Sequence, residues 1–264
     1  MIAAMFIIQS IMLSPFSTYS LLQISLDQTI ERNTLEEASA CVKSVVRADC
    51  AFIQRDLFGI VVSGLSFDDA SAFHMALKRR GFGTEVVADS KIPVLHESFS
   101  IQRIVIKEGN LIFTDTIGRE QSRSIEDVSL VVGGFLTQSR LKKVLVVETH
   151  SPARMHSFQH PAQLEQRQRF QDVPEFRLDF FFRSSPTRLR ASVSAESIMF
   201  FHGRPIRLRD TALLLGAMMD LQELLPPERV GQGLKRTDTK NVYPSLHSYE
   251  EEIRWHFYRL QLPT

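Results

Sequence analysis

Hydrophobic and polar positions between residues 21 and 92 follow two periods. Alternation predicts four short strands, in "LLQISLDQ", "DCAFIQRD", "FGIVVSGL" and "GTEVVAD". The 3.6-residue period predicts two helices, in "NTLEEASACVKSV" and "SFDDASAFHMALKRRG". In chain order the elements are strand, helix, strand, strand, helix, strand. This βαββαβ order predicts a ferredoxin-like α+β domain over residues 21–92.

Both helices carry start signals. Thr34 and Glu37 have the spacing of a capping box. Ser66 is the expected N-cap of the second helix, with Asp69 three residues later. Gly81 follows the last turn of this helix and predicts its end.

A different pattern follows "SKIPVLHES", which breaks both periods and predicts a domain boundary. Residues 96–226 contain short alternating runs separated by turns, and "KEGN" and "TIGRE" place a glycine where a hairpin needs positive φ. The apolar segment "DTALLLGAMMDLQELLP" predicts a helix with Asp210 as its N-cap. This layout predicts an antiparallel β-barrel with a helix at its open end.

One long segment interrupts the strands. Residues 151–174 are rich in Gln, Arg, Pro and His and predict an exposed, mobile insertion. His150, His156, His160, Glu148 and Asp172 offer nitrogen and oxygen donors of the kind that metals bind. Their spacing matches no helical ligand pair or zinc finger, so we expect a solvated loop and no metal.

The run "IKEGNLIFTDTIGREQSRSIEDVSLVVGG", with its later strands and helix, resembles the pleckstrin-homology-like (PH-like) barrels of many bacterial proteins. Ile125 and Val128 match the "I-x-x-V" strand of these barrels. The chain also resembles, over roughly residues 33–260, an uncharacterised bacterial family with a similar front domain and a C-terminal aromatic helix. The resemblance implies a fold, and it carries over no catalytic residue.

Glu126 and Asp127 interrupt an otherwise apolar strand in "SIEDVSLVVGGFL". Paired catalytic carboxylates must face one substrate, whereas adjacent strand residues point to opposite sides. We therefore expect the two acids to shape a bend at the start of the strand, where free backbone amides donate to a carboxylate.

Composition narrows the function. The 264 residues are 44% hydrophobic and 23% charged, which is typical of a folded globular protein. Thirty-one Lys and Arg nearly balance 30 Asp and Glu, so binding to nucleic acid or anionic lipid would have to be local. Cys41 and Cys50 alone supply neither a disulfide framework nor a four-ligand zinc site, which favours a cytoplasmic protein.

The first 20 residues form an apolar extension with three interpretations. "MIAAMFIIQSIML" is long enough for the core of a signal peptide but too short to span a bilayer, and no basic residue precedes it. The extension is a false start upstream of the true N-terminus, a weak signal or anchor, or an untidy lead into the first strand.

Four arginines are the candidate ligand-binding residues. Arg188 and Arg190 alternate in "TRLRASV", and Arg207 and Arg209 alternate in "RPIRLRD", so each pair shares one strand face. On neighbouring strands they would form a basic stripe that grips phosphate or carboxylate. A solvated face paired with nearby acids is the competing interpretation.

The tail "YPSLHSYEEEIRWHFYRLQL" predicts a C-terminal helix after a linker, in residues 227–264, with Ser248 and Glu251 as a capping box. This helix docks on its own barrel or contacts another chain. The candidate interaction residues are Tyr249, Ile253, Trp255 and Phe257.

No reactive residues converge in the sequence, and no cofactor motif is present. We therefore expect a non-enzymatic regulatory or scaffolding protein, without a cofactor, that acts through protein contacts or self-association. The alternative is a binder of an anionic ligand, lipid surface or nucleic acid that uses the arginine stripe. The third hypothesis is an enzyme with its site between the domains.

Overall fold

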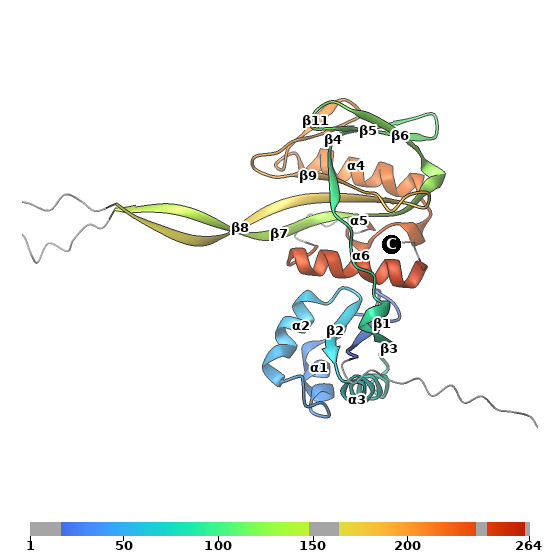
Figure 1. Cartoon of the computed structure of the whole chain (residues 1–264), viewed down its shortest axis with the longest axis vertical. Helices are drawn as coiled ribbons and strands as arrows, with labels where there is room; N and C mark the ends of the chain where they lie inside the picture. Colours follow the sequence, from blue (N-terminus) through green and yellow to red (C-terminus); the bar gives the residue numbers. More distant parts are fainter. Residues whose placement is uncertain (1–16, 148–163, 236–241, 262–264) are drawn as a thin grey trace, which may run out of the picture. The chain divides into compact units, whose positions relative to one another are not determined.

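The computed structural model describes residues 17–147, 164–235 and 242–261, and for residues 140–147 and 164–170 it describes the backbone alone (Figure 1). The fold is α+β, as the sequence predicts. Among the described residues, no helix combines the length and apolar character needed to cross a membrane. Met1–Phe16, which hold most of the apolar extension, lie outside the described residues.

The chain divides into two units. The first consists of Met1–His96 and His247–Thr264, and the second of Glu97–Leu246. The division at residue 96 falls within "SKIPVLHES". The tail helix, α6 (Leu246–Leu260), falls in the first unit from His247 onward.

The first unit contains a three-stranded antiparallel sheet in the order β2-β1-β3. Its remaining elements are helices and two short 3-10 turns. The bounds are β1 (Tyr19–Gln23), α1 (Arg32–Ser39), η1 (Arg47–Asp49), α2 (Cys50–Asp56), β2 (Ile60–Leu65), α3 (Phe67–Lys78), β3 (Thr84–Ala88) and η2 (Asp89–Lys91).

The predicted strand "DCAFIQRD" is wrong, because this segment forms η1 and α2. Cys50, Ile53 and Leu57 pack into the core of the first unit, at a helical spacing that the apparent alternation concealed. Phe52, which made the segment resemble a strand, is 61% exposed. The sheet therefore has three strands where the βαββαβ arrangement requires four, and the ferredoxin-like prediction is wrong at this element.

Strand β1 is covered on both faces, and all five of its residues are buried. Leu21 belongs to the core shared with α1 and α3, whereas its neighbour Leu22 packs with Trp255 of α6. The indole Nε1 of Trp255 donates a hydrogen bond to the carbonyl oxygen of Gln23 at 2.7 Å. Gly59 has a φ of +92°, and a Cβ there would lie 2.4 Å from Cγ of Trp255, so only glycine fits.

Two of the four predicted N-cap residues, Ser66 and Asp210, are at the N-cap positions of their helices. Ser66 caps α3, since its hydroxyl accepts a hydrogen bond from the amide of Asp69 at 3.1 Å. Thr34 and Ser248 lie inside α1 and α6, because these helices begin at Arg32 and Leu246. Asp210 is the N-cap residue of the helix Thr211–Leu224, as predicted, but its carboxylate accepts a hydrogen bond from the amide of Arg207 and does not cap the helix.

The second unit is an eight-stranded sheet with helices. Its strands are β4 (Ser98–Lys107), β5 (Asn110–Asp115), β6 (Glu120–Ser124), β7 (Val128–Val147), β8 (Leu164–Phe182), β9 (Arg188–Val193), β10 (Met199–Phe201) and β11 (Arg204–Ile206). The other elements are η3 (Ile125–Asp127), α4 (Thr211–Leu224), η5 (Pro227–Arg229) and α5 (Gln232–Lys235).

Both predicted glycine hairpins are confirmed. Gly109 (φ +76°) turns β4 into β5, and Gly118 (φ +90°) turns β5 into β6. Strand β4 then organises the sheet, because β9 and β10 pair with it in parallel along successive stretches. Among the described strands the sheet runs β11-β10-β4-β9-β8-β7 and does not close, so the predicted closed barrel is not found.

The predicted helix α4 supplies one wall of the second core. Leu214, Met218 and Leu221 are buried against the apolar face of the sheet. Phe113 and Phe180 meet edge to face there, with ring centroids 5.0 Å apart. The core of the second unit therefore lies between the sheet and α4.

Two predictions about β7 and β8 need correction. β7 is one continuous strand of 20 residues, whereas the patterns of "SIEDVSLVVGGFL" and "LKKVLVVETH" predict two separate strands. Residues 164–174 were expected in a mobile insertion, but they form the first part of β8. Their polar composition hid a strand that needs only β7 as its partner. The rest of the predicted insertion lies outside the described residues.

Candidate interaction site

The predicted corner role of the acidic pair is confirmed for Asp127. Glu126 and Asp127 lie in η3, directly before β7. The carboxylate of Asp127 accepts a hydrogen bond from the amide of Ser184 at 2.9 Å and a second one from the hydroxyl of the same residue. Asp127 therefore ties the start of β7 to the turn after β8.

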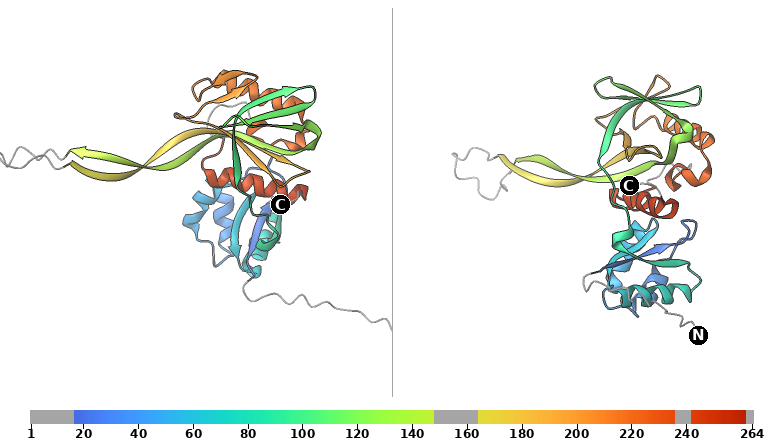
Figure 2. Two further views of the ribbon diagram at one scale, coloured as in Figure 1. Left: turned by 45° about the horizontal axis from the view of Figure 1, so that its top comes forward. Right: turned by 45° about the vertical axis from the view of Figure 1, so that its right-hand side comes forward.

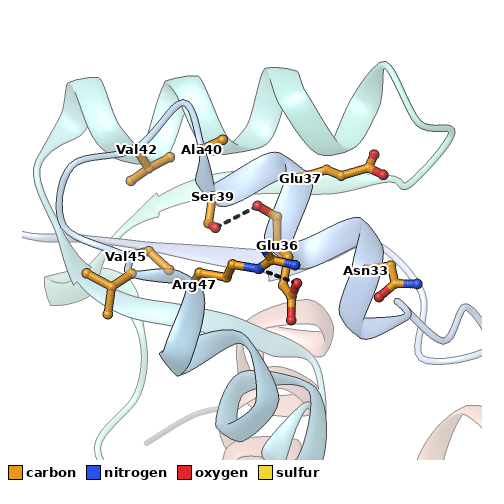
Figure 3. Close-up of a pocket in the computed structure, with 9 residues that line it drawn as sticks. Asn33, Glu36, Glu37, Ser39, Ala40, Val42, Val45 and Arg47 are labelled. Atoms are coloured by element: carbon orange, nitrogen blue, oxygen red, sulfur yellow. Dashed lines mark hydrogen bonds and ion pairs between the residues drawn. The ribbon is translucent and has the colours of Figure 1, made fainter.

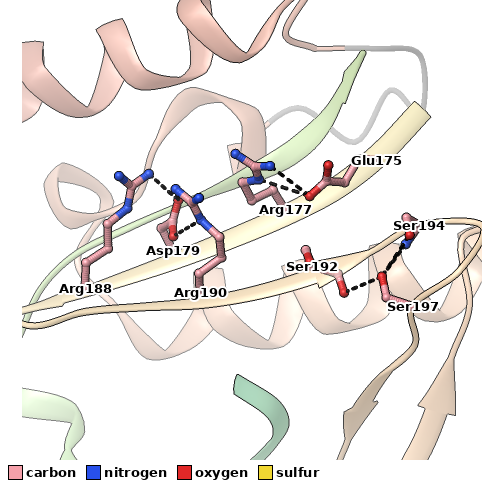
Figure 4. Close-up of polar contacts among 8 residues, drawn as sticks. All are labelled: Glu175, Arg177, Asp179, Arg188, Arg190, Ser192, Ser194 and Ser197. Carbon is pink, nitrogen blue, oxygen red and sulfur yellow. Dashed lines mark hydrogen bonds and ion pairs between the residues drawn. The ribbon is translucent and has the colours of Figure 1, made fainter. Parts of the chain in front are cut away.

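Arg188 and Arg190 lie on β9, on the face opposite to the apolar core (Figure 4). Both guanidiniums bind the carboxylate of Asp179, which is fully buried on β8. Nη2 of Arg188 donates to Oδ2 at 2.9 Å, and Nε of Arg190 donates to Oδ1 at 2.9 Å. The two arginines are therefore held by an internal acid.

Electrostatics keep that acid ionised. Burial alone would raise the pKa of Asp179, but the charges of Arg188 and Arg190 and their hydrogen bonds outweigh it and hold the pKa below its ordinary value. Two rows further along β8, Arg177 donates to Oε1 of Glu175 at 3.0 Å (Figure 4). The polar face of β8 and β9 is thus made of paired charges.

Arg207 and Arg209 do not extend this face. β11 ends at Ile206, so both arginines lie, exposed, in the turn that precedes α4. β11 pairs with β10, whereas β9 pairs with β4 and β8. The four arginines therefore do not form one stripe on neighbouring strands, and their role in binding an anion stays a prediction that this arrangement does not favour.

The candidate residues of the tail are placed in the interior. All four are buried, and Trp255 packs on the sheet of the first unit. Next to it, Arg259 donates to Glu85 at 2.7 Å, and the hydroxyl of Tyr258 donates to the same carboxylate at 2.9 Å. The helix therefore completes its own unit, and a role for Tyr249, Ile253, Trp255 and Phe257 in binding another chain stays a prediction.

A cavity of about 570 Å³ opens between α1 and η1 (Figure 3). Its main polar group is Glu36, which accepts hydrogen bonds from Nε of Arg47 and Nε of Arg32, each at 2.6 Å. These bonds, the one from Arg47 first, hold the pKa of Glu36 below its ordinary value. A carboxylate so engaged is a poor general base, so the cavity offers no evident chemistry.

The predicted absence of a metal site is tested only in part. Within the described ranges, no three His, Cys, Asp or Glu side chains lie close enough to hold a metal ion. His150, His156, His160 and Glu148 lie outside these ranges. Cys41 is exposed and Cys50 is buried, and both are free thiols.

The most distinctive feature of the second unit is a two-stranded arm. We define the arm as the paired segments Thr137–Val147 of β7 and Leu164–Pro174 of β8. In Figures 1 and 2 it extends beyond the other strands and helices of the second unit. Within the described residues, neither segment pairs with any strand but its partner, because β9 joins β8 only from Phe176 onward. Among the described strands the arm is therefore a ribbon of two.

The register of the arm sorts its residues into two faces, because successive rows of an antiparallel ladder alternate sides. One set, the apolar face, contains most of the large hydrophobic residues. Its rows are Ser139–Asp172, Leu141–Phe170, Lys143–Gln168, Leu145–Gln166 and Val147–Leu164.

The other set, the cationic face, contains four of the five basic residues of the arm. Its rows are Arg140–Gln171, Lys142–Arg169, Val144–Arg167 and Val146–Glu165. Sequence reasoning missed both faces, since it assigned Leu164–Pro174 to a loop. The available signal was the pairing of an alternating run in β7 with "LEQRQRFQDV", whose polar positions repeat every second residue.

Comparisons of the chain with protein-family models, with curated proteins and with solved structures find no match.

Proposed function

We propose that this chain is a non-enzymatic scaffolding protein that acts through protein contacts, and that the apolar face of the arm makes the contact. One observation carries the proposal: the arm projects as an isolated two-stranded ribbon with an apolar face. An isolated hairpin is marginally stable in water, so a face with Leu141, Phe170 and Leu145 favours cover by another molecule.

A second copy of the chain is the partner that the row pattern fits best. A two-fold axis through the row Leu141–Phe170 would pack this apolar row against its own copy. The same axis would bring the row of Lys143 in one copy against the row of Asp172 in the other. In such a dimer the apolar row Leu141–Phe170 would face its own copy, and the row with the basic Lys143 would face the row with the acidic Asp172.

The size of the arm sets the strength of this association. At about 3.3 Å per residue the arm is roughly 35 Å long, and two strands make it about 10 Å wide. Each copy would bury about 350 Å², less than half of the roughly 800 Å² per partner in a stable complex. The proposal therefore implies a weak dimer that forms in a concentration-dependent way.

The proposal extends to the scaffold and the compartment. We propose that the second unit is an opened relative of the bacterial PH-like fold, in which the glycine hairpins, β7–β9 and the terminal helix α4 are retained. The free thiols of Cys41 and Cys50 favour a cytoplasmic location, where cysteines stay reduced.

Sedimentation velocity of the full chain at increasing concentration tests the contact. We expect the average mass to rise from 30.1 kDa towards twice that value. Replacing Leu141 and Phe170 by Ser should keep the protein monomeric, because it removes the apolar row at the axis. Val144→Ser with Val146→Ser is the matched control, since it removes the same kind of surface from the cationic face.

Two results would contradict the proposal. One is a mass that stays at that of the monomer up to about 1 mM, since a Kd above this value corresponds to less than about 4 kcal/mol. The other is an equal loss of association in the Leu141/Phe170 variant and in the control.

A further inference from the structure

We propose that the cationic face of the arm binds duplex DNA by lying in the major groove. This inference goes beyond the proposed scaffolding role, because it uses the opposite face of the ribbon and different residues. It starts from the rows Arg140–Gln171, Lys142–Arg169 and Val144–Arg167, which follow one another on one face.

Positive charge is concentrated on this face. Four basic residues and one acid, Glu165, give it a net charge of +3, whereas the whole chain carries only +1. The other acid of the arm, Asp172, is on the apolar face, where it accepts a hydrogen bond from Ser139. A balanced chain with a local cationic strip can attract phosphates at that strip and repel them elsewhere.

The shape of the arm matches a groove of B-form DNA. The major groove is about 12 Å wide and admits a two-stranded antiparallel ribbon. The arm is such a ribbon, and it extends beyond the other strands and helices of the second unit. The deep, narrow major groove of A-form RNA does not admit a ribbon, so the geometry favours DNA over double-stranded RNA.

Contacts to phosphates give the proposal a measurable salt dependence. Each neutralised phosphate contributes about 0.9 to the slope of log K against log salt. Four contacts would give a slope of about −3.6, and losing one would weaken binding roughly eightfold at about 0.1 M salt. The cationic face thus predicts both the slope and the effect of a single substitution.

Neighbouring lysines on opposite faces provide the experiment. A labelled mixed-sequence duplex of about 20 base pairs is titrated with the full chain at about 0.05 M and about 0.2 M salt, and fluorescence anisotropy reports binding. We expect Lys142→Gln to weaken binding roughly eightfold and to reduce the slope by about 1. Lys143→Gln, with the same chemistry on the apolar face, should bind as the wild type does.

Further variants keep a folding defect from being mistaken for lost binding. Lys142→Arg preserves the charge and should restore affinity, whereas replacing Arg140, Lys142, Arg167 and Arg169 together by Gln should abolish binding. Circular dichroism and light scattering of each variant should match the wild type. Because association uses the other face, self-association should persist when DNA binding is lost.

Three results would overturn the inference. The first is a wild-type chain that does not bind the duplex at about 0.05 M salt. The second is an equal loss of affinity in Lys142→Gln and Lys143→Gln, which would mean that the cationic face is not the contact. The third is binding to vesicles of phosphatidylserine and phosphatidylcholine that depends on Lys142, combined with no binding of the duplex, which would assign the face to a lipid surface.

Discussion

The inner and outer halves of the β7–β8 hairpin are built from the same two strands but have opposite environments. Every residue of Val128–Leu136 and Glu175–Phe182 is buried. At the next rows, Thr137 and Gln138 are half-buried, and Ser139 and Asp172 are exposed. The two strands are therefore paired along their whole described length, whereas their side chains are buried only where further strands and helices cover them.

This difference separates stability from function within one hairpin. The inner half packs Phe176, Leu178 and Phe180 into a core that α4 covers, so its side chains should dominate the free energy of unfolding. The outer half pairs with no third strand among the described residues, so substitutions there should change binding more than folding. Substitutions at matched pairs of residues in the two halves test this division.

The largest effect is expected in the inner half at Asp179. Replacing Asp179 by Ala removes the carboxylate that neutralises the buried guanidiniums of Arg188 and Arg190. We expect the free energy of unfolding to fall by about 3–5 kcal/mol in urea denaturation. Asp115→Ala is the control, because Asp115 pairs with a largely exposed Arg119 and its loss should cost much less. Equal losses at both sites would show that burial of the charges does not matter.

A smaller loss is expected where the inner half has no room for a methyl group. A Cβ at Gly133 would lie 2.7 Å from Cδ1 of Leu178 and 3.1 Å from the carbonyl oxygen of Arg177. Gly133→Ala should therefore destabilise the protein by about 1–3 kcal/mol, measured by thermal unfolding. At Gly216 of α4 the added Cβ meets nothing within 4 Å, so Gly216→Ala should stabilise by about 0.5–1 kcal/mol. A stabilising Gly133→Ala would refute the close packing of β7 on β8.

The charged inner half also predicts a response to acid. The pKa of Asp179 is lower in the folded protein than its unfolded value of about 3.9. Its contribution to stability is therefore fully present above about pH 4 and is lost as the pH falls through the folded pKa. Denaturation curves should show this loss in the wild type and a weaker pH dependence in Asp179→Asn. An identical dependence would exclude Asp179 as its source.

The smallest effect on folding is expected in the outer half. Phe170→Ser should change the free energy of unfolding by less than about 0.5 kcal/mol, because among the described strands the arm pairs with no third strand. Phe180→Ser, ten residues along the same strand, should cost several kcal/mol, since its ring is fully buried. Comparable losses at Phe170 and Phe180 would show that the arm is folded into a larger core.

The sequence predicts correctly those caps, turns and helices whose structure depends on neighbouring residues. The cap at Ser66, the turns at Gly109 and Gly118 and the apolar helix α4 each depend on a few neighbouring residues, and all are confirmed. The corner at Asp127 was also predictable, because adjacent acids cannot share a strand face.

The wrong or open predictions concern segments whose structure depends on residues far away in the sequence. The segment of α2 has apolar residues at both strand and helix spacing, and its packing against α1 and α3 selects the helix. For the arginines of β9 the sequence leaves open an anion-binding stripe or a face paired with acids, because their acid, Asp179, lies on another strand. Leu164–Pro174 was read as a loop because a ribbon of two strands needs no buried face to pair.

The return of helix α6 to the first unit has a consequence for synthesis on the ribosome. The indole of Trp255 and the carbonyl of Gln23 are 232 positions apart, so one face of the first sheet is bare until residues 246–260 have left the exit tunnel. At about 5–20 residues per second, the second unit is translated within roughly 10–30 seconds, and it can fold during that wait. The first unit is thus the first to be translated and the last to complete its fold. Until then, the uncovered face of its sheet is the surface that chaperones would have to shield.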